Sequence, residues 1–287
     1  MTFFALGLVL TAAFFHATWN LLAKRAGGGG SAFVWLFGTL STLIYAPLAI
    51  VVVVFQRPHL GAVEFVFMFG SGVLHLGYFL LLQHGYRVGD LSLVYPLARG
   101  TGPVIATTAA IVLFGERPSV VALFGVVLIA VGVFLLAREP RRIEGSLLSR
   151  GVTYGVLTGT FIAAYTLWDK QAVSVLLIPP VLQDWSANLV RATLLSPLAV
   201  RRWAEVRAVW RAHKLEVLGV AVLTPLPYIL VLTALVFTPV SYVAPAREIS
   251  ILIGTAMGAH LLSEGNAPVR LLAAVAMVLG VVALALG

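Results

Sequence analysis

The sequence predicts an all-α polytopic membrane protein with ten transmembrane helices, arranged as two inverted repeats of five helices. Three observations lead to this fold class. Of the 287 residues, 60% are hydrophobic and 10% are charged, whereas soluble domains carry about 25% charged residues. The mean hydropathy is +1.02. Apolar stretches of roughly 20 residues, the length that crosses a bilayer, recur along the chain, and its second half repeats the first.

The apolar stretches are separated by short runs of Gly, Pro and charged residues, which are typical of helix ends and loops. We place the ten helices at residues 2–23, 32–55, 63–83, 91–113, 119–137, 151–170, 182–200, 217–236, 240–262 and 268–286. The first stretch is not expected to be a cleaved signal peptide, because no basic residue precedes it and Lys24 and Arg25 follow it.

Composition excludes several classes of protein. The formal net charge is +8, but the basic residues separate apolar segments and do not cluster with aromatics on a polar face, so we expect no nucleic-acid partner. Without cysteine there is no disulfide, thiolate metal site or cysteine nucleophile. No H-E-x-x-H or G-x-S-x-G motif is present, and no paired acids share a predicted face. We therefore expect neither an enzyme nor a cofactor or metal.

The distribution of basic residues predicts the orientation in the membrane. Thirteen lysines and arginines lie in the loops after the first, third, fifth, seventh and ninth helices, and three lie in the loops on the other side. Loops rich in Lys and Arg stay in the cytoplasm. This bias places both termini outside.

An internal repeat divides the chain into residues 1–137, a basic linker at 138–150, and residues 151–287. "FFHATWNLLAK" (14–24) matches "TFIAAYTLWDK" (160–170), and "SLVYPLAR" (92–99) matches "SYVAPARE" (241–248). "LFGE" (113–116) likewise matches "LLSE" (261–264). Because five spans is an odd number, the second copy enters the membrane in the opposite orientation. Inverted repeats recur in secondary transporters, with the substrate site near the midplane.

These paired motifs resemble the EamA-type transporters of the drug/metabolite transporter superfamily. The similarity rests on the 5+5 arrangement, the aromatic-to-lysine end of the first helix in each half, and a proline-containing fourth helix that ends in "GE" in the first half. It implies ten helices with the fifth and tenth peripheral, and export or exchange of small metabolites, prominently amino acids including aromatic ones. We also expect a small-molecule solute and the lipid bilayer as partners, a multi-pass location in the bacterial inner membrane, and a monomer or weak homodimer. The family picture has cytoplasmic termini, unlike the charge count.

Arg99 lies about nine residues inside its apolar stretch, roughly 13 Å along a helix and close to the middle of a bilayer. A charge at that depth costs about 2.5–3.5 kcal/mol on insertion scales. The repeat aligns Arg99 with Glu248, so we expect an ion pair across the pseudo-twofold axis, either fixing helix register or taking part in transport. Pro96 predicts a kink or break in the same helix, and Pro245 repeats this feature.

Further polar side chains in the apolar segments suggest a cavity. Asp184, Asn188 and Arg191 form one stripe at helical spacing, interpreted either as a polar contact between packed helices or as a cavity face. Arg99, Arg191 and Arg247 outnumber the buried acids, so a carboxylate or phosphate would be bound favourably. His16, Trp19, Asn20 and Lys24 share a face of the first helix.

From these patterns we list two sets of candidate residues. The substrate-binding candidates are His16, Trp19, Asn20, His75, Tyr78, Tyr95, Arg99, Tyr165, Tyr228, Tyr242 and Arg247. The structural or coupling candidates are Lys24, Pro96, Asp169, Lys170, Arg191, Pro245 and Glu248. Interfacial aromatic belts are the alternative explanation for aromatics near segment ends.

Three functional hypotheses follow. The first is a carrier of small organic solutes, amino acids foremost, that works by alternating access. The second keeps the fold and carries organic phosphates, nucleotide sugars or a lipid-linked phosphate. The third is a membrane scaffold without transport. If proton exchange drives the protein, then His16, His75, Asp169 or Glu248 must carry the proton, whereas facilitated diffusion needs none of them.

Overall fold

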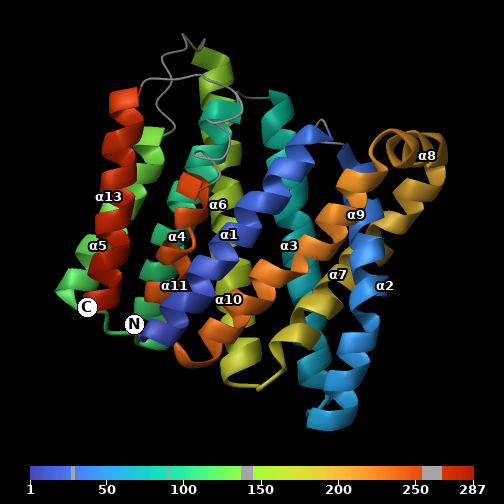
Figure 1. Ribbon diagram of the computed structural model, residues 1–287, viewed down its shortest axis with the longest axis horizontal. Coiled ribbons are helices and arrows are strands. Elements are labelled where there is room, and N and C mark those ends of the chain that lie inside the picture. The colour runs from blue at the N-terminus through green and yellow to red at the C-terminus, as the bar shows by residue number, and fades with distance from the viewer. Residues whose placement is uncertain (27–29, 89–90, 137–144, 254–266) are drawn as a thin grey trace.

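The computed structural model describes residues 1–26, 30–88, 91–136, 145–253 and 267–287, and within these ranges its regular structure is helical (Figure 1). The helices are α1 (Phe3–Arg25), α2 (Gly30–Gln56), α3 (Ala62–Val88), α4 (Leu91–Phe114), α5 (Val120–Leu136), α6 (Gly145–Ser174), α7 (Pro180–Arg201), α8 (Trp203–Ala212), α9 (Lys214–Leu223), α10 (Pro225–Phe237), α11 (Val240–Ala246) and α13 (Ala267–Leu286).

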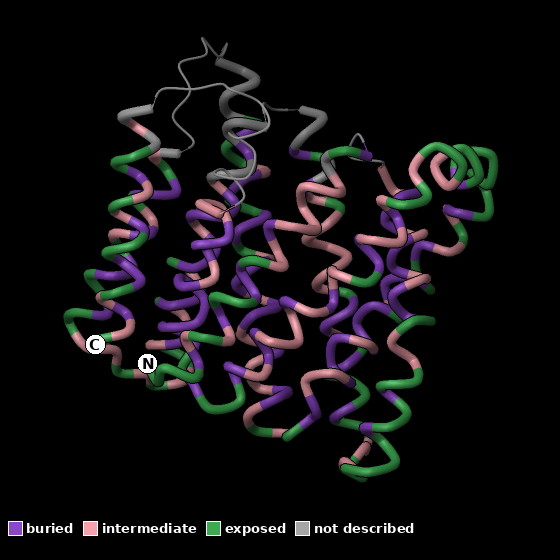
Figure 2. Tube along the Cα trace, in the orientation of Figure 1, coloured by how far each residue is buried: buried purple, intermediate pink, exposed green. Residues whose placement is uncertain are grey.

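The chain is a membrane protein with several apolar helices. Among the described residues, five stretches are long and apolar enough to cross a membrane: Phe3–Ala23, Gly30–Gln56, Ala62–Leu82, Leu97–Phe114 and Lys214–Phe237. Exposed residues follow the outer faces of the bundle and buried ones its interior (Figure 2). On the outer faces of α5 and α13, large apolar side chains such as Phe124 and Leu279 are exposed, as lipid contact requires. The count of ten spans stays a prediction.

The helices from the two parts of the sequence are interleaved. α6 packs against α3 and α4, while α1 packs against α9 and α10. α2 lies against α7, and α5 lies against α13 at one side of the molecule (Figure 1). Both termini lie at the same end of the bundle, where the Met1 amine is 3.5 Å from the Leu284 carbonyl oxygen.

Glycines allow α5 and α13 to approach at the level of the backbone. A Cβ on Gly125 would lie 2.7 Å from the Gly280 carbonyl oxygen, and a Cβ on Gly280 would lie 2.8 Å from the Gly125 carbonyl oxygen. Such a reciprocal contact leaves no room for any side chain at either position. Helix contact through small residues is common between transmembrane helices.

Several predicted helix boundaries need correction. α6 begins at Gly145, inside the predicted 138–150 linker, and continues to Ser174. The predicted helix at 217–236 is divided into α9 and α10 beside Pro225, which lacks the backbone donor that a continuous helix needs. The segment between the predicted helices 182–200 and 217–236 contains a further helix, α8, in which Val206 is buried against Ala32 and Ala199.

No break occurs in the fourth predicted helix, since α4 is one continuous helix, and a kink within it stays a prediction. Its glycines serve close packing instead: a Cβ on Gly102 would lie 2.9 Å from Ile162 of α6. The break occurs in the ninth predicted helix, where α11 ends at Ala246, Arg247 and Glu248 form a turn, and residues 249–253 are helical again. Here the amides of Glu248, Ser250 and Ile251 bond to carbonyls three residues earlier, as in a tightened 3₁₀ turn.

Candidate functional site

A cavity opens in the middle of the bundle, between α1, α2, α3, α4, α6, α7, α10 and the turn after α11. The space between its walls that holds no protein atoms is about 910 Å³, counted together with the solvent at its mouth. It is lined by the predicted residues His16, Trp19, His75, Tyr78, Arg99, Tyr165, Arg191, Tyr228 and Arg247, together with Phe37, Phe79, Asp184, Asn188, Ser250 and several small apolar residues.

Other candidates lie elsewhere. The Asn20 side-chain amide donates to the His16 carbonyl oxygen of its own helix, at 2.7 Å, and does not line the cavity. The Tyr242 hydroxyl donates to the Gly287 carbonyl oxygen at 3.2 Å, so it lies toward the α5 and α13 end. Pro245 contacts a small pocket between α4, α5 and α11. The side chains of Lys24, Tyr95 and Pro96 lie outside what the structure describes.

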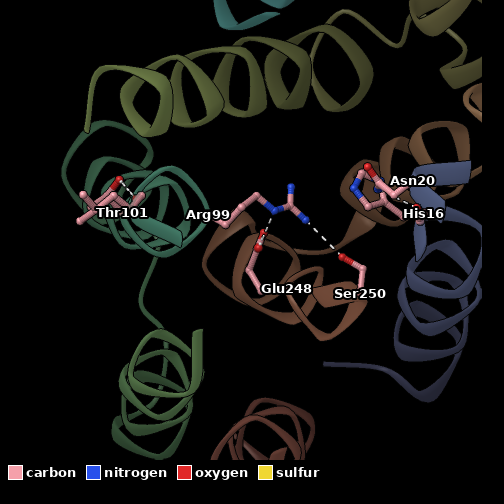
Figure 3. A network of polar contacts seen from close by, with 7 residues as sticks. His16, Asn20, Arg99, Thr101, Glu248 and Ser250 are labelled. Atoms are coloured by element: carbon pink, nitrogen blue, oxygen red, sulfur yellow. Dashed lines mark hydrogen bonds and ion pairs between the residues drawn. The ribbon is translucent and has the colours of Figure 1, made fainter. Parts of the chain in front are cut away.

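The ion pair expected from the repeat register is confirmed. Arg99 Nε lies 3.0 Å from Glu248 Oε2, and the two side chains are 5% and 3% exposed. Arg99 Nη2 also donates to Ser250 Oγ at 3.2 Å (Figure 3). In the same view His16 and Asn20 lie on α1, beyond Ser250. The turn at Arg247 and Glu248 therefore brings a carboxylate and a hydroxyl to one guanidinium.

A cluster of aromatic rings surrounds Tyr165 on α6. The His75 ring stacks on Tyr165 at a centroid distance of 4.2 Å, and Tyr78 and Tyr228 meet it edge to face at 5.7 and 6.0 Å. Edge-to-face contacts of this kind are favourable between aromatic rings. His75 Nδ1 lies 2.9 Å from the Ser71 carbonyl oxygen. Because a carbonyl oxygen only accepts hydrogen bonds, Nδ1 carries a proton and donates it to this oxygen. These contacts fix the aromatic wall.

The stripe of Asp184, Asn188 and Arg191 on α7 faces the cavity, which agrees with the second of its two interpretations, a cavity face. Asn188 Nδ2 donates to Asp184 Oδ2 at 3.0 Å, and Arg191 Nη2 donates to Asn188 Oδ1 at 2.5 Å. The Arg191 guanidinium also lies over the rings of Phe37 and Phe79, at 5.6 and 5.9 Å. Asp184 and Asn188 were absent from the candidate set, although their helical spacing with Arg191 had indicated them.

Asp169 and Lys170 are both held by the protein. Asp169 is fully buried and accepts hydrogen bonds from Gln183 Nε2 at 2.9 Å and from the Tyr228 hydroxyl. Lys170 Nζ donates to the Leu235 and Thr238 carbonyl oxygens at 2.7 and 3.2 Å, at the end of α10. Asp169 thus adjoins the cavity through Tyr228, which itself lines it.

Glu116 was missed by the sequence analysis as a functional or structural residue. Its carboxylate accepts hydrogen bonds from the backbone amides of Val240 at 2.7 Å and Ser241 at 2.9 Å, at the start of α11. The acid of the first "GE" motif therefore caps a helix of the second half. Together with Lys170 it fixes both sides of the connection between α10 and α11.

The described residues contain no group of three His, Asp or Glu side chains placed to hold a metal ion. The cavity offers hydrogen-bonding groups, charges of both signs and aromatic surface. Such a lining can contact both polar and apolar groups.

The comparisons with known proteins agree with this fold. A model of the EamA-like transporter family matches residues 3–138. A crystal structure of another protein superposes with a TM-score of 0.79 over 98% of this chain and 96% of that one, at 14% sequence identity, which shows a shared fold. No curated protein matches the sequence. The similarity to the EamA-like transporter family therefore extends over residues 3–138, just under half of the chain.

Proposed function

We propose that this protein is a secondary transporter of small zwitterionic solutes, foremost amino acids including aromatic ones, which it exports. The observation that carries the proposal is the pairing of opposite charges in one cavity. Asp184 offers a carboxylate, and Arg191 and Arg247 offer guanidinium groups. An amino acid presents the complementary ammonium and carboxylate. Arginine suits the carboxylate end because it can form two parallel hydrogen bonds.

The remaining lining favours an apolar or aromatic side chain on the solute. Trp19, Tyr78, Tyr165 and Phe79 line the cavity, and the His16 and Trp19 rings meet edge to face at 5.0 Å. Trp19 Nε1 is buried and has no hydrogen-bond partner among the described residues. A buried donor without a partner is costly unless a ligand accepts its hydrogen bond. Trp19 therefore supports a solute that carries an acceptor.

Alternating access about this cavity is the proposed mechanism, on ten spans arranged as an inverted repeat in a bacterial inner membrane. The packing of helices supports the repeat. α2 lies against α7, α4 against α11 and α5 against α13, and each pair joins corresponding helices of the two halves. Contacts between corresponding elements are expected around a twofold axis. The ion pair between Arg99 and Glu248 links equivalent positions in the same way.

One observation favours a second candidate, a carrier of organic phosphates. Three arginines line the cavity, Arg99, Arg191 and Arg247, and phosphate binds such groups strongly. Arg99 is already neutralised by Glu248, and Arg191 is bonded to Asn188. The Asp169 carboxylate, beside the cavity, would repel a doubly charged phosphate ester, and such an ester has no ammonium group for Asp184 to bind. The zwitterion therefore fits the charges better.

Counterflow in proteoliposomes tests the proposal. Vesicles loaded with unlabelled L-phenylalanine should accumulate radiolabelled L-phenylalanine. Vesicles loaded with unlabelled glucose 6-phosphate should not accumulate radiolabelled glucose 6-phosphate. The opposite result would identify a phosphate carrier. If neither pair exchanges and neither compound raises the melting temperature of the purified protein, the proposal is wrong and a membrane scaffold becomes the better explanation.

A further inference from the structure

The carboxylates around the cavity differ in how their charge is compensated. Glu248 is paired with Arg99 at 3.0 Å. Asp169 accepts hydrogen bonds from two donors, Gln183 and Tyr228. Among the described residues Asp184 has no ion pair, and the side-chain donor that reaches its carboxylate is the neutral amide of Asn188. Asp184 is also the acid, of these three, that lines the cavity.

An ionised carboxylate that is buried with one neutral donor is costly in a membrane protein. Asp184 is 6% exposed, and Asn188 lies between it and Arg191, so Arg191 attracts the Asp184 carboxylate from a distance without forming an ion pair with it among the described residues. Two cations can neutralise such a carboxylate from the cavity. One is a proton, and the other is the ammonium group of a bound solute.

Ionisable groups on α7 itself and on the helices packed against it interact with Asp184 or share its cavity, and they influence the binding of a proton or of an ammonium group there. They are Tyr45 on α2, His75 and Tyr78 on α3, Asp169 on α6, Arg191 on α7 and Tyr228 on α10. Tyr45 is bonded to the Val222 carbonyl oxygen at 2.6 Å, and His75 is bonded to Ser71. α8 also contacts α7, but it begins beyond Arg201, about 26 Å along the helix from Asp184.

We propose that Asp184 is the common binding site of a proton and of the solute ammonium group, so that the two exclude each other. In the empty cavity the carboxyl group holds a proton on one oxygen. When the solute binds, that O–H bond breaks, the proton leaves to the water in the cavity, and the carboxylate accepts hydrogen bonds from the ammonium. One proton is released for each solute bound. This inference rests on the proposed function, because it requires an ammonium-bearing solute.

Mutual exclusion couples the two movements across the membrane. If the binding site changes the side of the membrane that it faces only while it holds either the solute or the proton, the protein exchanges one for the other. A proton gradient directed into the cell would then drive the solute out. The other candidates for a proton carrier fit less well, because Glu248 is ion-paired and His16 shares the cavity with Arg99 and Arg247, which repel a further positive charge.

Titration calorimetry on the purified full-length protein tests the inference. L-phenylalanine is titrated in buffers that differ in ionisation enthalpy, which gives the number of protons released on binding. We expect about one proton to be released per L-phenylalanine bound. In the pH range where Asp184 is protonated, the affinity should fall about tenfold for each unit by which the pH is lowered. For 3-phenylpropionate, which lacks the ammonium, we expect no proton release and no loss of affinity at low pH.

The variant Asp184→Asn keeps the shape of the side chain and removes the proton site. It should bind L-phenylalanine at least tenfold more weakly, without proton release and independently of pH. Glu64→Gln is the matched control, since Glu64 is a buried acid that bonds to the Gly61 amide outside the cavity, and it should behave as the wild type.

The outcomes separate the two proposals. If the wild type binds L-phenylalanine without releasing a proton, or if Asp184→Asn still releases one, the inference about Asp184 is wrong while the proposed function stands. If the wild type binds neither L-phenylalanine nor 3-phenylpropionate, the proposed function itself fails. Melting temperatures of the three proteins show whether a loss of binding reflects loss of folding.

Discussion

Arg99 on α4 and Glu248 after α11 form a buried ion pair, with 3.0 Å between Nε and Oε2, across the two halves of the chain. Their sequence separation matches the spacing of the internal repeat. Each charge is neutralised by the residue at the equivalent position in the other half. The pair therefore joins a continuous helix to a broken one at the edge of the cavity.

The first prediction concerns this pair. Either Arg99→Gln or Glu248→Gln should lower the free energy of unfolding by ~3–5 kcal/mol, because each leaves an uncompensated buried charge. The double variant should recover much of that loss. Chemical denaturation in detergent, analysed as a double-mutant cycle, measures the coupling. Strictly additive losses would show that the two residues are not coupled.

The second prediction concerns Trp19. Trp19→Ala should weaken L-phenylalanine binding about tenfold, or ~1.4 kcal/mol, since it removes both ring contact and the unpartnered Nε1 donor from the cavity wall. Trp210→Ala is a suitable control, because Trp210 on α8 packs against a hydrophobic cluster that includes Phe33 and Val217 and does not line the cavity. If the Trp19→Ala variant has a much lower melting temperature but binds L-phenylalanine normally while folded, Trp19 belongs to the hydrophobic core instead.

The third prediction concerns the contact between α5 and α13. Gly125→Ala places a methyl group within 2.7 Å of the Gly280 carbonyl oxygen, so the helices must separate, at a cost of about 1–3 kcal/mol. In α1, Gly7→Ala meets no atom within 4 Å and should be neutral or stabilising by up to about 1 kcal/mol. Melting temperatures of the two variants are compared. Equal effects would argue against close contact at Gly125.

The fourth prediction concerns Glu116. Glu116→Ala should destabilise the protein by about 1–3 kcal/mol, since the amides of Val240 and Ser241 lose a charged acceptor. Glu116→Gln keeps one carbonyl oxygen and should cost less. Glu205→Ala removes a solvent-exposed acid of α8 and should have little effect. A Glu116→Ala variant as stable as Glu205→Ala would contradict the capping role.

The fifth prediction concerns orientation. If the excess of basic residues in odd-numbered loops governs topology, both termini lie outside. A C-terminal fusion to a reporter that fluoresces only in the cytoplasm should then remain dark, while a reporter active outside should give signal. A bright cytoplasmic fusion would instead place the termini inside, as the family picture has them.

The features that follow from hydropathy and from the internal repeat could be predicted from the sequence. Apolar stretches indicated most helices, and the repeat register identified Glu248 as the partner of Arg99. Most aromatic and basic candidates line one cavity because they share helical faces directed inward.

The features that depend on tertiary packing could not be predicted. Pro96 and Pro245 occupy equivalent positions in the repeat, yet only the helix that contains Pro245 is interrupted. In α4, Gly102 lets the helix pack closely on Ile162 of α6, and this packing outweighs the low helix propensity of glycine. The Glu116 cap joins residues 124 positions apart, so no local pattern could indicate it.

The interleaved packing has a consequence for how the chain becomes a folded protein. α6 of the second half lies against α3 and α4, and α1 of the first half lies against α9 and α10. Each half thus donates its first helix to the other, in the manner of a domain swap. Residues 1–137 or 151–287 synthesised alone would leave those helix faces uncovered. The boundary between the halves is therefore a boundary of the sequence only, and we expect the whole chain to fold as one cooperative unit.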